Sequence, residues 1–196
     1  MRMGMKPHIA GELAWLLSRG PCGRRGLARA TGLGEIVVRR ELERLERLGF
    51  VALERRGTRL TPRGREEFAP ILIGIKEVKE LQLRELALDR FTLGAALAGA
   101  EATKGRGLPI PSWRLRDLAI REGASGAILM AFSGSRLIFS DSGEELSARN
   151  PQDGALLRES FPGLEEGDLL VLVSAPERKG AHLGLWRIII ELLLLH

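Results

Sequence analysis

Arginine is the residue type with the clearest chemical potential in this chain. The 30 basic residues comprise 25 Arg and only five Lys, and 13 of the arginines lie between positions 19 and 65. A guanidinium group offers a planar fork of donors that matches phosphate oxygens and guanine edges. Biased genome composition also enriches Arg over Lys, so this preference alone does not identify a nucleic-acid-binding protein.

The charge is distributed unevenly along the 196 residues, whose net charge is +5. Residues 1–72 hold 15 basic and 8 acidic residues, whereas residues 73–196 hold 15 basic and 17 acidic residues. A basic first third and a mildly acidic remainder predict two domains with different partners. The basic part has the electrostatics expected of a nucleic-acid binder.

Other reactive side chains form no recognisable set. His8, His182 and His196 have no metal-ligand spacing, Cys22 stands alone, and the carboxylates show no paired pattern. We therefore expect no catalytic residues, no metal and no cofactor, and the chain is not predicted to be an enzyme. One cysteine permits no internal disulfide, which favours a cytoplasmic protein. The apolar run 183–195 is too short to span a membrane.

One loop in the acidic part has a composition suited to an anion. Ser174 ends a predicted strand, and Arg178 and Lys179 begin the helix that follows. A strand-to-helix junction favours bound anions because backbone N–H groups point out of the helix N-terminus. These three residues are predicted to bind a ligand, with an ordinary solvated loop as the alternative.

The elements that must position the arginines follow from apolar spacing and from glycine and proline. Helices are expected at 8–19, 24–31 and 34–48, then short strands at 50–54 and 59–61, and a fourth helix from Pro62 capped by Thr61. Three helices, a hairpin and a further helix are the order of a winged helix.

The helix at 34–48 is the predicted DNA-reading element. With Val38, Leu42 and Leu45 facing inward, and Leu48 expected beside them, Arg39 and Arg40 face outward as contacts to base edges. The remaining predicted DNA-binding residues contact phosphates: Arg44, Arg47, Arg24, Arg25, Arg55, Arg56 and Arg59. The alternative is that Glu and Arg of this helix pair with each other on a solvated face.

The rest of the chain reads as an α/β domain, which makes the whole protein α+β. The order over 91–196 is β-α-β-β-α-β-α, best matched by a ferredoxin-like α/β sandwich, with a small doubly wound sheet as the alternative. Residues 73–90 fit a helix or a strand equally well and are treated as a linker or domain joint. The predicted domains are therefore 1–72 and 91–196.

Two parts of the chain resemble known families. Residues 26–68, with LERLERLGFV followed by LTPRGREEF, are similar to prokaryotic and archaeal winged helix-turn-helix transcriptional regulators. RDLAIREGASGAILMAF (116–132) and GDLLVLVSAPERKGAHLG (167–184) resemble an uncharacterised α/β domain behind winged helices in archaeal regulators. This resemblance implies a DNA-binding domain joined to a domain that senses a ligand or mediates assembly.

The expected function is sequence-specific binding of double-stranded DNA for transcription regulation. A homodimer would present two winged helices to two half-sites, and a small-molecule effector in the second domain would change their spacing. The dimer contact is expected either in the C-terminal helix, around Trp186, Ile189 and Leu193, or in 73–90. The alternative function is a protein-interaction scaffold whose winged helix binds a protein partner.

Overall fold

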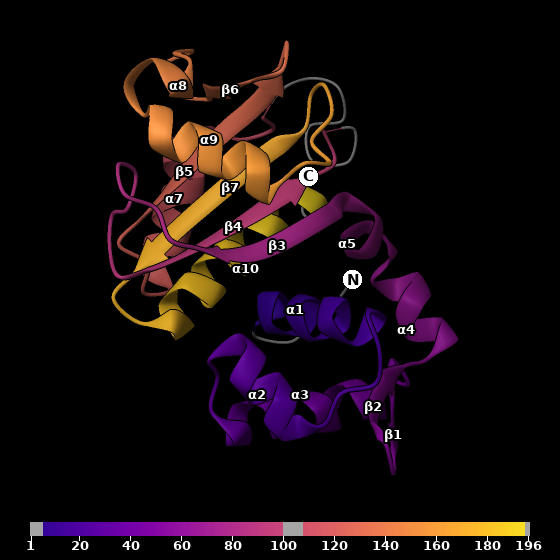
Figure 1. Ribbon diagram of the computed structural model, residues 1–196. Helices are drawn as coiled ribbons and strands as arrows, with labels where there is room; N and C mark the ends of the chain where they lie inside the picture. Colours follow the sequence, from indigo (N-terminus) through magenta and orange to yellow (C-terminus); the bar gives the residue numbers. More distant parts are fainter. Residues whose placement is uncertain (1–5, 100–107, 195–196) are drawn as a thin grey trace. The chain divides into compact units, whose positions relative to one another are not determined.

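Two compact units divide the chain after Leu72. The computed structural model describes residues 6–99 and 108–194 and separates Met1–Leu72 from Ile73–His196 (Figure 1). The fold is α+β, as predicted.

The first unit contains the expected elements in the expected order. They are α1 (Pro7–Ser18), α2 (Arg24–Thr31), α3 (Glu35–Arg47), β1 (Val51–Glu54), β2 (Gly57–Leu60), α4 (Pro62–Glu67) and α5 (Ala69–Gly74), which crosses the unit boundary. Glycines end the helices because they adopt the left-handed conformation without strain: Gly32 has φ 69° and Gly49 has φ 77°.

The β1–β2 hairpin is tight and is extended by a third strand-like segment. Val51 pairs with Leu60 and Glu54 with Gly57, so the turn consists of two residues. Cys22, in the loop before α2, exchanges two backbone hydrogen bonds with Thr58, of 3.0 and 2.9 Å. Thr61 accepts a hydrogen bond from the Gly64 N–H at 3.0 Å, which confirms it as the cap of α4.

The second unit is built on a fully antiparallel sheet with the strand order β3-β4-β7-β5-β6. Its elements are β3 (Ile75–Leu81), β4 (Phe91–Leu97), α7 (Ser112–Arg121), β5 (Gly126–Ser133), β6 (Arg136–Phe139), α8 (Leu146–Arg149), α9 (Pro151–Ser160), β7 (Leu169–Ala175) and α10 (Arg178–Leu194). The central strand β7 is buried along its whole length, because helices cover both faces of the sheet.

Residues 73–90 belong to the second unit and are no separate linker. β3 pairs with β4 from Ile75↔Leu97 to Leu81↔Thr92, and so adds an edge strand ahead of the predicted order. The apolar residues of this edge strand, Ile75, Val78 and Leu81, recur every three positions, a spacing that is also typical of helices, which explains why the sequence does not separate the two.

The helix layers differ from the ferredoxin-like sandwich, in which the helices share one face of the sheet. α8 and α9 cover one face, whereas α7 and α10 cover the other (Figure 1). The sheet is not doubly wound either, because none of its strand pairs is parallel. Strand order depends on contacts far apart in sequence, which apolar periodicity does not reveal.

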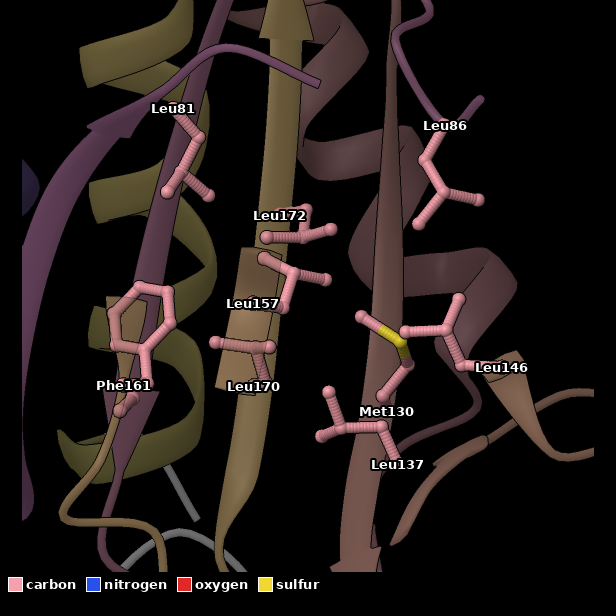
Figure 2. Close-up of a cluster of buried hydrophobic side chains, with 10 residues drawn as sticks. Leu81, Leu86, Met130, Leu137, Leu146, Leu157, Phe161, Leu170 and Leu172 are labelled. Atoms are coloured by element: carbon pink, nitrogen blue, oxygen red, sulfur yellow. The ribbon is translucent and has the colours of Figure 1, made fainter. Parts of the chain in front are cut away.

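A cluster of buried side chains joins α8 and α9 to the sheet. Figure 2 shows Leu157 and Phe161, at the end of α9, lying against Leu170 and Leu172 of β7. Met130 of β5 is completely buried in the same cluster. On the opposite face, Gly184 of α10 lets that helix approach Val173 and Ala119 closely.

Candidate nucleic-acid interface

α3 has the orientation that its apolar spacing predicts. Val38, Leu42 and Leu45 are 0%, 4% and 0% exposed, so this edge of the helix packs into the core of the first unit. Leu48, which was expected beside them, is 39% exposed. Leu48 follows the last residue of α3 and lies off the centre of its apolar stripe. The prediction that Leu48 packs inward with the other three residues is therefore wrong.

The outer face of α3 carries the two arginines predicted to contact base edges. Arg39 and Arg40 are both exposed. Arg39 forms an ion pair with Glu43, one turn further on, at 3.5 Å, whereas Arg40 has no ion-pair partner among the described residues. Both guanidinium groups are therefore accessible from solvent, with Arg39 partly neutralised.

Arg44 is less available than the sequence suggested. Its side chain is 23% exposed, and its Nε lies 3.1 Å from both carboxylate oxygens of Glu41, with Nη2 at 2.5 Å. This bidentate pair directs Arg44 along the helix surface toward a carboxylate. Arg47 remains exposed and donates to the Glu43 carbonyl at 3.3 Å.

A cleft of about 460 Å³ separates α3 from the hairpin. Four of the nine predicted DNA-binding residues line it: Arg24, Arg39, Arg55 and Arg56. They come from three separate elements, α2, α3 and the β1–β2 turn. The fold thus gathers arginines that are up to 32 positions apart in the sequence on one concave surface.

The start of α2 contributes a second group of charges next to this cleft. Glu35, the first residue of α3, lies 3.5 Å from Arg24 and 3.8 Å from Arg25. The side chains of both arginines are still about half exposed or more, at 47% and 85%. Such exposed pairs contribute little to stability, so their guanidinium groups can exchange partners.

The hairpin divides its predicted arginines into two groups. Arg55 and Arg56, at the turn, are exposed and have no ion-pair partner among the described residues. Arg59 pairs across the hairpin with Glu54. The turn therefore presents two free positive charges, whereas the strands present a neutral pair.

Sequence reasoning missed several residues that share this surface. Glu43, Glu54 and Leu53 line the cleft, and Ile36 lines an adjacent hollow with Arg24 and Arg39. Ile36 and Leu53 are 61% and 51% exposed, which is unusual for side chains of this size. The pair of Arg39 and Glu43 follows the alternative that the sequence offered for this helix, but no local signal places Leu53 next to α3.

The three residues predicted to bind an anion in the second unit do not converge. The Ser174 hydroxyl is buried and lies 2.8 Å from the Thr92 hydroxyl inside the sheet. Arg178 pairs with Glu80 of β3 at 2.6 Å, and Lys179 is exposed. Ser174 is held in the sheet and Arg178 is paired with Glu80, so these three side chains do not point to one common position.

Among the described residues, the ionisable groups with shifted pKa values belong to the second unit. Partial burial lowers the pKa of Lys76, but hydrogen bonds and charges from Asp168 and Glu165 outweigh it, so its pKa is raised. Hydrogen bonds from Ser133 and the Gly134 N–H lower the pKa of Glu166. The hydrogen bonds of Lys76 and Glu166 join strands of the sheet to the loop before β7.

Within 6–99 and 108–194, no three His, Cys, Asp or Glu side chains are grouped as metal ligands would be. None of the helices in that part of the chain has the length and apolar content that a membrane span requires.

Comparison with known proteins identifies the fold but no activity. Residues 99–192 match a family described as a domain of unknown function, DUF4443. A solved structure, hypothetical protein PH0730 from Pyrococcus horikoshii OT3, is similar with a TM-score of 0.71 and 22% identity over 94% of this chain and 91% of that chain. At this level of identity the likeness concerns the fold alone. No curated protein matches the chain.

Proposed function

We propose that the first unit is a winged helix that binds double-stranded DNA, and that the protein is a transcription regulator. The observation that carries this proposal is the cleft lined by Arg24, Arg39, Arg55 and Arg56. Arginines on a helix and on an adjacent hairpin turn match the two features of a duplex that a winged helix contacts, the major groove and the flanking phosphates.

Within this proposal the arginines have different tasks. Arg39 and Arg40 project from the N-terminal half of α3, so they reach base edges when the helix enters the major groove. Arg55 and Arg56 contact phosphates from the hairpin turn, and Arg24 and Arg25 do so from the start of α2. Arg44 and Arg59 retain their carboxylate partners and contribute less.

The second unit would regulate or dimerise the protein, in keeping with its separate core. No ligand is assigned to it, because its three predicted ligand-binding residues do not converge. The proposal includes a cytoplasmic location, where such a protein meets DNA.

The test is fluorescence anisotropy with genomic DNA fragments at about 50 and 200 mM salt. A protein that makes six to ten phosphate contacts loses about 10³–10⁵-fold in affinity between these conditions. R39A/R40A should abolish preference for a selected sequence. R65A removes an exposed arginine of α4 outside the cleft and is the control, which should retain the affinity of the unaltered protein.

A protein-interaction scaffold is the second candidate, because Ile36 and Leu53 expose large apolar surfaces beside the cleft. Apolar side chains within a charged rim are common at protein interfaces. Folded protein that does not bind DNA at about 50 mM salt, while I36A/L53A loses a protein partner that R39A/R40A retains, would replace the DNA-binding proposal with this one.

A further inference from the structure

The outer face of α3 carries a carboxylate among side chains that suit contact with DNA. Ile36, Arg40 and Glu43 follow one another at spacings of four and three residues, which places them on one face of the helix. All three are exposed, and their face lies opposite Val38 and Leu45, which are completely buried. Glu43 therefore belongs to the face that α3 turns to solvent.

The carboxylate of Glu43 has one oxygen near an arginine and one oxygen available. Oε1 lies 3.5 Å from Nε of Arg39, and the Glu43 side chain is still 56% exposed. Among the described residues, Oε2 has neither an ion pair nor a hydrogen bond. Glu43 also lines the arginine cleft on the side that α3 forms. Arg39 thus holds the carboxylate in place while one oxygen can accept a hydrogen bond from a ligand.

The other three carboxylates of α3 lack this arrangement. Glu35 pairs with two arginines of α2 at the start of the helix. Glu41 is held by Arg44, and its side chain is only 16% exposed. Glu46 is exposed, but it lies one turn after the buried Leu42 and therefore at the margin of the apolar stripe. Glu43 alone combines exposure with a position on the outer face.

The chemistry of a carboxylate restricts what it can contact on DNA. It repels phosphates, so on a DNA-binding surface it lowers affinity unless it meets a hydrogen-bond donor. The donors in the major groove are the N4 amino group of cytosine and the N6 amino group of adenine, and adenine also presents its acceptor N7 beside N6. An ionised carboxylate only accepts hydrogen bonds. It therefore favours cytosine and opposes guanine and thymine, whose hydrogen-bonding groups there are acceptors.

We propose that Glu43 determines part of the sequence that the protein selects, by accepting a hydrogen bond from the N4 amino group of one cytosine. This inference rests on the proposed DNA binding and adds the identity of one base pair to it. Arg39 is then also a positioning residue for Glu43. Arg40 and Glu43 are about 4.5 Å apart along the helix axis, close to one base step of about 3.4 Å, so they contact neighbouring base pairs.

The experiment compares the base preference of the full chain with that of E43A and E43Q. A site is first selected from a random duplex library, and anisotropy then measures binding to duplexes with each base pair at each position. At one position the unaltered protein should bind a C·G pair about tenfold more tightly than the other pairs. E43A should lose this preference. E43Q should shift it to A·T, because an amide offers a donor and an acceptor that match N7 and N6 of adenine.

The matched control is E46Q, which removes the same charge by the same change one turn later on α3. Both glutamine variants should bind unrelated DNA more tightly than the unaltered protein, because each removes a negative charge from a surface near phosphates. E46Q should nevertheless keep the base preference of the unaltered protein at every position of the site.

The outcomes separate this inference from the proposal on which it rests. If E43A and E43Q bind all duplexes more tightly and keep every preference, Glu43 only neutralises Arg39; the inference is overturned and the DNA-binding proposal stands. A shift in preference that E46Q shares with E43Q overturns the inference as well. Folded, unaltered protein that binds no DNA at about 50 mM salt overturns the proposed function together with this inference.

Discussion

At the scale of single residues, the position of a carboxylate decides what each arginine can do. Glu41 holds Arg44 in a bidentate pair, and Arg59 is paired across the hairpin. Arg40, Arg55 and Arg56 have no such partner among the described residues. Two arginines in similar local sequence therefore differ in their availability to a phosphate, which the count of basic residues does not reveal.

Asp153 is the residue whose loss we expect to be most damaging to the second unit. It is 1% exposed, and its carboxylate accepts hydrogen bonds from the backbone N–H groups of Arg84, Glu85 and Leu86 at 2.7–3.2 Å. The Glu85 carboxylate in turn accepts the N–H groups of Gln152 and Asp153 at 3.1 Å. This exchange joins the loop after β3 to the start of α9.

We predict that D153A lowers the free energy of unfolding by roughly 3 kcal/mol. The alanine leaves three backbone donors without an acceptor, and hydrogen bonds to a charged group contribute about 1.5–3 kcal/mol each before relaxation. Urea denaturation measures the change. E159A removes an exposed carboxylate from the same helix and should have almost no effect; equal losses in both variants would contradict the assigned role of Asp153.

At the scale of elements, sequence signals between neighbouring residues predicted the helices and strands, whereas contacts between distant segments were not predicted. The capping by Thr61, the helix ends at Gly32 and Gly49, and the tight hairpin depend on neighbouring residues, so the sequence was sufficient for the first unit's elements. The strand order of the second unit and the helix layers depend on contacts between distant segments. The cleft has the same origin, since nothing near Leu53 in the sequence indicates that it lies beside α3.

Gly64 shows why one particular element packs as it does. It lies in the first turn of α4, where a Cβ atom would come within 2.0 Å of the Phe50 carbonyl oxygen. Phe50 and Phe68 meet edge to face at 5.8 Å beside this point, so α4 approaches the start of β1 closely. The hairpin and α4 are held together through a contact that tolerates no side chain.

We predict that G64A destabilises the first unit by at least about 2 kcal/mol, since backbone must move to relieve the clash. Thermal unfolding followed by circular dichroism measures the loss. G163A is the matched control, because a Cβ at Gly163 meets nothing within 4 Å and the backbone there has no positive φ. If G64A and G163A unfold at the same temperature, the close approach of α4 to β1 does not contribute to stability.

At the scale of the whole molecule, the proposed function assigns DNA binding to the first unit. The arginine cleft of this unit would bind one half-site of DNA. Once one copy is on the DNA, the neighbouring half-site presents a second copy at a high effective concentration, so even a weak contact between the two copies adds to the affinity.

A homodimer on DNA predicts a specific pattern of cooperativity. On DNA with two copies of the selected half-site, at the spacing that selection favours, affinity should exceed that for one half-site by about 10²–10⁴-fold. R39A/R40A should lose the preference for both DNAs over unrelated sequences, because it alters the arginine cleft, whereas R65A should retain it. Equal affinity for one and two half-sites would contradict a homodimer on DNA. Titration of both DNAs with the unaltered protein and the two variants measures the gain.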